Sequence, residues 1–491
     1  MVISESQNTR KMPVPQGSGE VSSEAHKISA STPYNFAGKN LTPYGGLFPV
    51  ATMLEKLKFQ ELIEEATQTV KRIPRVMSMY QFMLGMVLAL YVGFSRLNHL
   101  QYVAQDPMLI GILKVPGLPG QSTFWRFLAS LHSGVAEKLL QVERKMRARV
   151  WAAAHVKLNS ITLDTDTTVH TVYSNRKMGA RKSYNPKNKG KKSFQPILTF
   201  IAETREYIWG ELRNGDRPGG KQIARHLAAV LAAVPGCVET ICARADAGFY
   251  CWEAVQAYEK GKVDFIVVAR KTPRLVEKLQ TAAWKPSPKT DADEQCEFWY
   301  QPEGWGKAYR FIGLRYKKKK EPAGEAREQY QLFDTAEYLY RVFVTNMKRS
   351  IDLLVWFYRQ RAGAENLIKE ANNDAGLAAH PSRGWATNCV HFQLVMLAYN
   401  LNCWLLLFHR EEGVKVEELK HTTLATARLR FLFLAARIWR HAGRDGISYS
   451  DHYQEKGVFH RLLKRLRAIT WEAGENFLPV LATPLLGLGC A

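Results

Sequence analysis

The chain has 491 residues, of which 46% are hydrophobic and 23% are charged, a composition that excludes wholesale disorder, collagen and a long coiled coil. The formal net charge is +23, which favours a polyanionic partner: nucleic acid first, an anionic membrane surface second. The seven cysteines form no Cys-x-x-Cys pair, which argues against a disulfide framework or a zinc finger and favours a reducing compartment.

The first part of the chain predicts a leader followed by helices. Residues 1–40 are rich in Ser, Thr, Gly and Pro and are expected to be disordered. Residues 41–155 carry apolar side chains at three- and four-residue spacing, which predicts a helical domain. A capped basic helix at 124–131 follows a Pro/Gly turn and is either half of a DNA-binding helix-turn-helix or an ordinary helix. The apolar stretches 83–94 and 395–408 are read as buried core helices of a soluble protein, because the first is too short to span a membrane and the second contains two asparagines.

The period changes near residue 156, and strands alternate with helices up to residue 270. Strands are predicted at 160–170, 194–202, 207–213, 238–244 and 263–269, with helices at 220–234 and 252–259. Three strands followed by alternating helices and strands is the order of the ribonuclease-H-like fold. The expected fold class is therefore α/β, with a ribonuclease-H-like catalytic core flanked by helical N- and C-terminal regions.

The last part of the chain is expected to interrupt and then complete this core. Residues 271–346 contain three strand-like runs and are interpreted as a β-rich insertion subdomain. Residues 347–410 return to helix and complete the core, and residues 411–491 form a basic helical C-terminal region. The helices are predicted at 351–372, 388–409, 421–442 and 458–472.

Carboxylates stand out in the predicted core. Asp164 and Asp166 lie two apart in the first strand and share a face with Thr168. Buried carboxylates need a partner or a cation, so the pair indicates a metal site unless this is a solvated edge strand. Asp246 follows the carboxyl end of a later strand, where sites assemble in open α/β sheets, although it could also be a helix cap.

A third acid, Glu365, lies in a predicted helix. Tyr358, Arg361, Glu365, Lys369 and Asn372 fall on one stripe of that helix, and apolar residues flank the stripe. A polar stripe on a partly buried helix indicates a site, and the alternative is a solvated Arg–Glu–Lys ladder.

Together these segments resemble the DDE transposases of bacterial insertion sequences, in the subclass with a Tyr-x2-Arg-x3-Glu signature. Tyr358, Arg361 and Glu365 match that spacing, Asp166-Thr-Thr matches the context of the first carboxylate, and Asp246 has the Arg-x-Asp-x-Gly-Phe context of the second. The resemblance covers residues 45 to 410. The chain departs from the signature at Asn372, where the subclass has lysine.

The resemblance implies that Asp166, Asp246 and Glu365 are the catalytic triad and bind two Mg²⁺ (or Mn²⁺) ions. Arg361 would hold a phosphate and Tyr358 would hydrogen-bond the DNA backbone. Lys369 could replace the missing lysine, and Asp164 could also reach the metals, although the Asp-Thr-Thr match favours Asp166.

Basic clusters predict the path of the DNA. The loop after the first strand holds eight cations without an acid, and two further lysines lie in the predicted insertion: Arg176, Lys177, Arg181, Lys182, Lys187, Lys189, Lys191, Lys192, Lys317 and Lys318. The alternative is a solvated charge run. Residues 460–467 form a third cluster on an amphipathic helix. The family also inserts an aromatic side chain near the cleavage point, for which Trp299 and Trp305 are candidates.

The expected function is that of a transposase that cleaves the ends of its insertion sequence and joins the 3′ ends to target DNA. Double-stranded DNA with terminal inverted repeats is the expected partner, with no membrane role, and a homodimer on paired ends in the bacterial cytoplasm is expected by resemblance. The alternatives are a ribonuclease-H-like endonuclease without strand transfer and an inactive DNA-binding derivative.

Overall fold

In the computed structural model, the first strand of the main sheet along the chain, β2 (Ser160–Thr167), is the third of nine strands counted from one edge. This structure describes residues 28–70, 76–186, 188–317, 338–411, 413–471 and 479–481. Residues 1–39 form one unit and residues 40–491 a second. All elements below belong to the second unit; of the predicted leader, residues 1–27 lie outside the described ranges.

The sheet has the order β10-β11-β12-β13-β9-β8-β2-β6-β7. Its strands beside β2 are β6 (Ile197–Ile201), β7 (Tyr207–Glu211), β8 (Thr240–Ala245), β9 (Asp264–Val268), β10 (Lys285–Pro286), β11 (Glu294–Tyr300), β12 (Tyr309–Lys317) and β13 (Tyr338–Thr345). β2, β6 and β7 form an antiparallel meander, while β2, β8 and β9 are parallel neighbours. This order confirms the predicted α/β class with a ribonuclease-H-like core.

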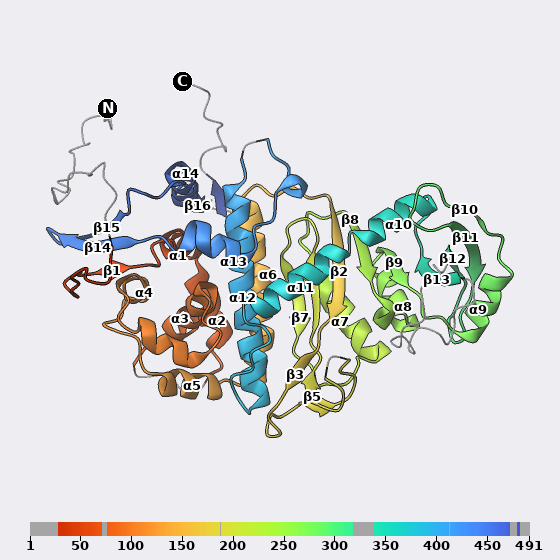
Figure 1. The fold of residues 1–491 in the computed structure, drawn as a ribbon, viewed down its shortest axis with the longest axis horizontal. Helices are drawn as coiled ribbons and strands as arrows, with labels where there is room; N and C mark the ends of the chain where they lie inside the picture. Colours follow the sequence, from red (N-terminus) through yellow and green to blue (C-terminus); the bar gives the residue numbers. More distant parts are fainter. Residues whose placement is uncertain are drawn as a thin grey trace. The chain divides into compact units, whose positions relative to one another are not determined.

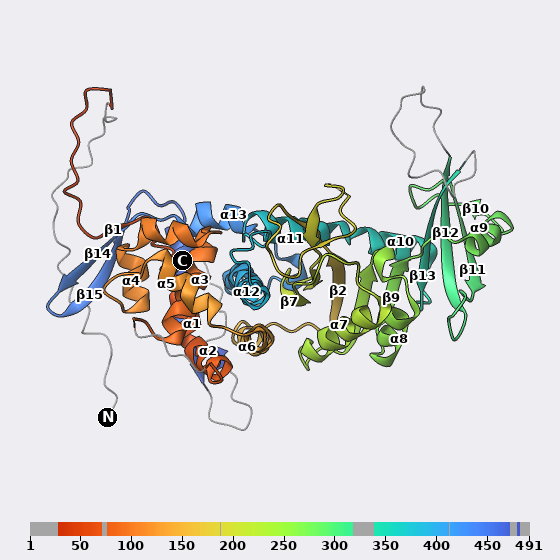
Figure 2. The ribbon, with the colours of Figure 1, turned by 90° about the horizontal axis from the view of Figure 1, so that it is seen from below.

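Helices cover both faces of this sheet, as expected for parallel strands joined by crossovers. Figure 2 shows α10 (Ile351–Arg359) and α11 (Ala362–Asn373) on one face, and α7 (Gly220–Ala233) and α8 (Trp252–Lys260) on the other. The alternation within β9 fits this arrangement: Ile266 belongs to the core beneath α10, whereas Phe265 and Val267 belong to the core that includes α8.

The predicted insertion is not a separate subdomain. β13 pairs antiparallel with β9, matching Phe343 with Val268 and Thr345 with Ile266, so β10 to β13 extend the main sheet. The short helix α9 (Pro273–Gln280) connects β9 to these strands. The physical reason is that an unpaired β9 edge would expose a row of backbone donors and acceptors, which β13 satisfies.

The N-terminal helices share one core with the sheet. They are α1 (Leu47–Lys56), α2 (Phe59–Thr67), α3 (Met79–Val92), η2 (Leu97–Val103), α4 (Pro107–Leu113), α5 (Gln121–Ala129) and α6 (Ser133–Ala153). Between them and the sheet runs the central helix α12 (Trp385–His409), which packs against α3 and α6 (Figure 1). Ser78 and Gln81 cap α3 reciprocally, and Asp106 accepts two backbone N–H groups at the start of α4.

Buried polar contacts join α6, α12 and the β6–β7 connection. Glu206 is fully buried and accepts hydrogen bonds from Arg147 at 2.9 Å, from Trp151 at 2.7 Å and from Trp404 at 3.1 Å. Asn400 of α12 accepts from the Tyr207 N–H and donates to the Tyr207 carbonyl. These contacts satisfy polar groups that would be costly to bury alone.

Among the described helices, α12 is long and apolar enough to cross a membrane, and the bent pair α3 and η2 passes the same test of length and composition. The apolar window of α12 is wholly buried inside the fold. This matches the expectation of a buried core helix at 388–409.

The C-terminal part differs from the predicted helical region. It contains η4 (Val416–Glu418), α13 (Leu424–Ala427), the π-helical η5 (Arg428–Leu432), β14 (Ala436–His441), β15 (Arg444–Tyr449), α14 (Lys456–Arg467), β16 (Ile469–Trp471) and β17 (Pro479–Leu481). The helix predicted at 421–442 is wrong: its second half is a strand of a β-hairpin that also pairs with β1 (Leu41–Thr42). Ala442 and Gly443 at its tip have positive φ, which ends any helix there.

Candidate active site

Two parallel strands bring Asp166 and Asp246 to the same edge of the sheet. The register of β2 and β8 pairs Thr165 with Ala245. The next residues, Asp166 and Asp246, therefore both lie at the carboxyl ends of these strands. The Asp246 carboxylate accepts the Gly248 N–H at 2.8 Å and caps the short helix η3 (Ala247–Phe249).

Arg361 connects the first and third predicted acids. It stands at the N-cap of α11, and its Nη2 lies 2.7 Å from Asp166 Oδ2 while its Nη1 lies 3.5 Å from Glu365 Oε1. The side chains of Arg361 and Asp166 are 8% and 16% exposed, and that of Glu365 is 57% exposed. The guanidinium is therefore buried at the sheet edge, while Glu365 reaches solvent.

The electrostatics show that the three acids share one neighbourhood. The pKa of Asp166 is raised to about 6, mainly by burial; the negative charges of Asp246 and Glu365 add to this rise, and Arg361 opposes it. Burial would lower the pKa of Arg361, but the surrounding acids raise it above its usual value. Asp246 and Glu365 thus favour the neutral form of Asp166, and Arg361 favours its ionised form.

Asp164 is occupied by a different arginine. Arg244, its direct neighbour on β8, donates to both oxygens of the Asp164 carboxylate at 2.7 and 2.6 Å and also to the Phe357 carbonyl. Both groups are almost fully buried. Because this bidentate pair uses both Asp164 oxygens, Asp164 braces the sheet against α10, and Asp166 is the aspartate of β2 that remains for a site.

The predicted stripe on one continuous helix is wrong. The chain breaks at Gln360 between α10 and α11, so Tyr358 and Glu365 stand on different helices. Tyr358 is buried against Phe343 with ring centroids 4.8 Å apart, whereas Lys369 is exposed one turn after Glu365. Tyr358 thus belongs to the buried core, whereas Lys369 and Glu365 are both exposed to solvent.

Asn372, the position where lysine was expected, joins α11 to the segment after Asp166. Its side-chain amide donates to Thr168 Oγ1 at 3.3 Å and its carbonyl oxygen lies 2.8 Å from His170 Nε2. His170 Nδ1 lies 3.1 Å from His380 Nε2. Since the amide oxygen only accepts, His170 Nε2 donates, and in a neutral His170 the other nitrogen, Nδ1, then accepts from His380. Burial lowers the pKa of His170 to about 4, in agreement.

The donor chemistry of the acid cluster fits a hard divalent cation, because carboxylate oxygens are the ligands that Mg²⁺ prefers. Within the described ranges, however, no group of three or more His, Cys, Asp or Glu side chains is arranged to hold a metal ion. The guanidinium of Arg361 contacts both Asp166 and Glu365 in this cluster.

The basic loop after β2 is partly ordered by a small sheet of β3 (His170–Val172), β5 (Lys192–Phe194) and β4 (Arg181–Lys182). Several of its cations have protein partners: Lys177 donates to the His380 carbonyl, Arg181 pairs with Asp216 and Lys192 donates to the Asn175 carbonyl. The exposed cations without an ion pair among the described residues are Arg176, Lys182, Lys189 and Lys191.

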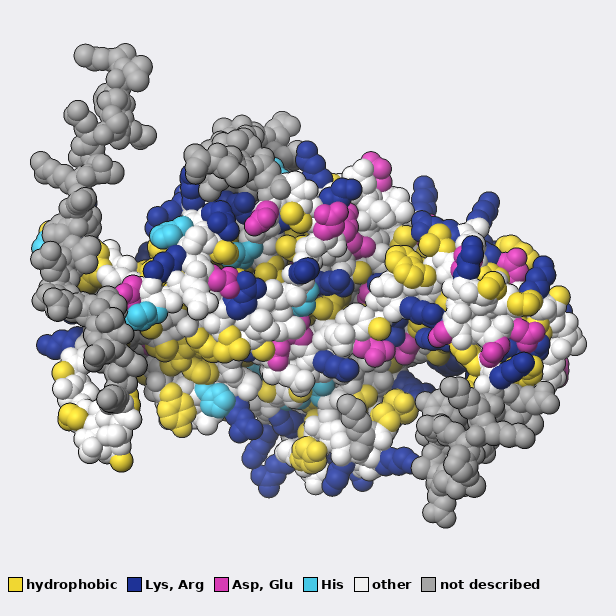
Figure 3. Space-filling model, turned by 45° about the horizontal axis from the view of Figure 1, so that its top comes forward, with side chains coloured by type: hydrophobic (Ala, Val, Ile, Leu, Met, Phe, Trp, Pro, Cys, Tyr) yellow, Lys and Arg dark blue, Asp and Glu magenta, His cyan; other side chains and the backbone are white. Residues whose placement is uncertain are grey.

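Basic side chains also lie elsewhere on the surface. Figure 3 shows Lys and Arg side chains in groups at several places on one face. Lys317 is exposed at the end of β12, and its N–H donates to Asp293 at 2.7 Å. Lys187 and Lys318 lie outside the described residues.

The two candidate tryptophans differ in burial. Trp305 is buried in an aromatic cluster with Tyr250 and Trp252, so it belongs to the core. Trp299 on β11 is 71% exposed.

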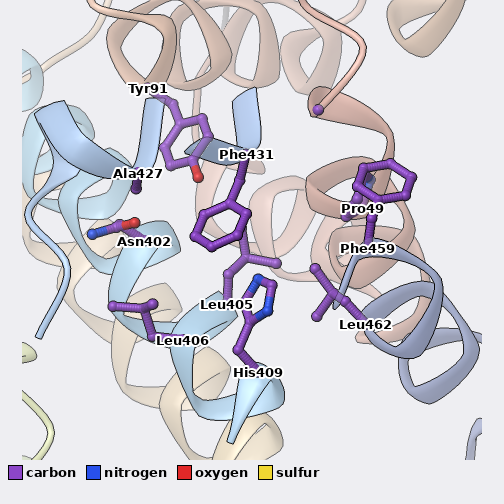
Figure 4. A pocket seen from close by; sticks show the side chains of 11 residues that line it. Pro49, Tyr91, Asn402, Leu405, Leu406, His409, Ala427, Phe431, Phe459 and Leu462 are labelled. Atoms are coloured by element: carbon purple, nitrogen blue, oxygen red, sulfur yellow. The ribbon is translucent and has the colours of Figure 1, made fainter. Parts of the chain in front are cut away.

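A pocket lies apart from the acid cluster, between α1, α12, η5 and α14 (Figure 4). The rings of His409 and Phe431 are 4.7 Å apart, and the lining is mostly apolar. Its chemistry does not match that of the carboxylates, so it is not the candidate active site.

The sequence analysis did not identify several residues that shape the site. Arg244 and the His170–His380 pair were not singled out, nor was Arg270, which donates to the Ala247 carbonyl at 2.8 Å and braces the turn after Asp246. The sequence position of Arg270 could have identified it, because Arg270 comes just after the parallel strand β9, as Asp246 comes just after the parallel strand β8. No sequence signal pairs His170 with His380, 210 residues later.

Comparison with known proteins identifies a family over most of the chain. No curated protein matches it. A cryo-EM structure of the piggyBac transposase synaptic complex with hairpin DNA is similar with a TM-score of 0.43 and 13% identity over 79% of both chains, too low to support an argument. The model of the family "Transposase DDE domain group 1" matches residues 26–471. By this match, the chain belongs to the DDE-domain transposases of group 1.

Proposed function

We propose that this protein is a DNA transposase that cleaves the ends of its own element and joins the 3′ ends to target DNA by two-metal phosphoryl transfer. The observation that supports the proposal is the charge interaction of Asp246 and Glu365 with Asp166, together with the contacts of Arg361 to Asp166 and Glu365. Family membership supports the reaction class, and the acid cluster is the proposed site of the reaction.

The roles follow from the position of each side chain. Asp166, Asp246 and Glu365 would bind the divalent ions, which activate the attacking oxygen and neutralise the leaving oxygen. Arg361 presents a fork of donors that matches a phosphate, and binding of cations at the acids would free it from Asp166 and Glu365. Burial raises the pKa of Asp166, to about 6, and its carboxylate is the form that would bind a cation.

Double-stranded DNA with inverted repeats is the proposed partner. The exposed cations Arg176, Lys182, Lys189 and Lys191 follow directly from the Asp166 strand, so they are placed to contact phosphates beside the site. The proposed assembly is a homodimer that pairs the two ends of the element. The proposed source of the gene is a bacterial insertion sequence.

The test uses purified protein and a DNA fragment that carries the gene with its natural flanks. We expect Mg²⁺- or Mn²⁺-dependent nicking at the element ends and joined products with a target plasmid. Asp166→Asn, Asp246→Asn and Glu365→Gln should each abolish nicking and retain DNA binding. Glu277→Gln removes an exposed carboxylate on α9 and should behave as the unaltered protein.

The products separate the proposal from its alternatives. Nicking without joined products would identify an endonuclease, and binding without any nicking an inactive derivative. Full nicking by one of the three site variants would remove that residue from the site.

A further inference from the structure

The β14–β15 hairpin presents two different faces. Ile438 and Ile447, a directly paired couple, are partly buried against the core. On the opposite face, Arg437, His441 and Arg444 are exposed. Since side chains alternate across a strand, this separation follows from the register of the hairpin.

The outer face of the hairpin is cationic. Its members are Arg437, Trp439 and His441 from β14, with Arg444, Gly446 and Ser448 opposite them on β15, and it contains no acid. Neither Arg437 nor Arg444 has an ion-pair partner in the described part of the chain. The single hairpin acid, Asp445, is on the other face, where it pairs with Arg440 at 3.3 Å.

The shape of this face is fixed by two local features. A Cβ on Gly446 would lie 2.1 Å from the Trp439 ring, so only glycine lets that ring lie across the neighbouring strand. Ala442 and Gly443 at the tip have φ of 47° and 75°, the geometry of a tight two-residue turn. Figures 1 and 2 both show the hairpin tip projecting away from the helices α3 and α4.

The face of the hairpin that carries Ile438 packs on a basic helix. Tyr449 at its base packs on Phe459 of α14 with ring centroids 5.0 Å apart. α14 buries Leu462 and Leu466 and exposes four of its cations, which are Lys456, Arg461, Lys464 and Arg467. The base of the hairpin is therefore held against a helix of the same charge.

We infer that the outer face of the β14–β15 hairpin is a DNA-contacting ribbon that binds the phosphate backbone of duplex DNA independently of the acid cluster. Beyond the two residues of β14 that pair with β1, the hairpin is a two-stranded ribbon, which has the width that a major groove admits. Arginines without an ion pair among the described residues, on a face without acids, supply phosphate contacts. This inference rests on the proposed function for its choice of partner, because the +23 charge alone also suits other polyanions.

The experiment measures binding of a fluorescent random-sequence 30-base-pair duplex (about three turns) by anisotropy, in EDTA, at several salt concentrations. Arg437→Gln and Arg444→Gln should each reduce the slope of log affinity against log salt by about 1, and the double variant by about 2. The double variant should also bind about tenfold more weakly at moderate salt.

Arg440→Gln is the matched control, because it removes one arginine from the same hairpin on the opposite face. It should leave the salt slope unchanged. An equal loss for all three single variants would show a general charge effect and overturn the inference, as would unchanged binding by the double variant. Melting temperatures within about 2 °C of the unaltered protein establish that the variants are folded.

Failure of this inference is distinct from failure of the proposed function. The EDTA assay reports binding without metal-dependent chemistry, so a protein that never cuts DNA can still show the loss at Arg437 and Arg444. Conversely, active nicking with unchanged binding by the double variant would overturn the ribbon and leave the active site in place.

Discussion

Arg361 controls the charge of the acid cluster at the scale of single residues. Its guanidinium is the main group that lowers the pKa of Asp166 against burial and against two other acids. A buried arginine beside several carboxylates reduces their mutual repulsion, which lets the acids gather before any cation arrives. The same residue would be released toward a phosphate when cations bind.

Arg361→Gln should therefore raise the pKa of Asp166 above about 6, because a positive neighbour is lost while burial remains. The low-pH limb of metal-dependent nicking should shift to higher pH, and a pH–rate profile measures this shift. Arg359→Gln removes an arginine that pairs with Asp291 instead, and its profile should coincide with that of the unaltered protein. A profile unchanged in Arg361→Gln would contradict the assignment.

Asn372 shows how one substitution in a motif is accommodated. Its amide holds Thr168 and His170, so a side chain without that amide leaves polar groups unpaired. We expect Asn372→Ala to lower the free energy of unfolding by about 1–3 kcal/mol. Asn372→Lys should cost more, because it brings a charge toward a neutral His170 that requires an acceptor.

Urea unfolding of these variants measures the cost. Asn373→Ala, at the exposed neighbouring position, is the control and should change stability by less than about 0.5 kcal/mol. Unfolding free energies equal to that control for both Asn372 variants would refute the bracing role.

At the scale of elements, the hairpin tip carries local strain. Ala442 has a φ of 47°, a conformation that costs an L-residue with a Cβ about 1–2 kcal/mol, and Gly443 follows at 75°. Ala442→Asn should stabilise the protein by roughly 0.5–1 kcal/mol, since Asn-Gly suits this turn. Gly443→Ala should destabilise it by a similar amount. Melting temperatures distinguish the two variants. A lower melting temperature for Ala442→Asn would contradict the two-residue turn assigned to the tip.

For the whole molecule, buried histidines predict acid sensitivity. Burial lowers the pKa of His170 and His391 to about 4, of His226 to about 3 and of His409 to about 4. A histidine with a depressed folded pKa stabilises fully above its unfolded pKa of about 6.5, and this stability is lost as the pH falls toward the folded pKa. Acids with raised pKa values act in the opposite direction and reduce this loss; they are Asp106, Glu143, Asp164, Asp166, Glu203 and Asp374.

We therefore expect the free energy of unfolding to fall by several kcal/mol between pH 6.5 and about 4, at about 1.4 kcal/mol per unit of pKa shift. Urea titrations at half-unit pH intervals measure it. His226→Gln should make the free energy of unfolding depend less steeply on pH, because it removes one group that binds a proton in the unfolded state and not in the folded state. Stability that rises toward pH 4 would contradict this expectation.

The sequence by itself determined the elements of the core and indicated the candidate acids. Period-two strands followed by period-3.6 helices gave the order β2, β6, β7, α7, β8, α8, β9, because hydrophobic periodicity is a local property. The spacing of Tyr358, Arg361 and Glu365 and the Asp-Thr-Thr context pointed to the family that the chain belongs to.

Only the tertiary structure decided which groups are partners. Arg244 pairs with Asp164, so Asp166 pairs with Arg361, and Asn372 contacts His170, which is 202 residues away along the chain. It also decided that β13 extends the main sheet and that residues after 435 form a hairpin. Pairing partners and register depend on contacts distant in sequence, which local periodicity does not encode.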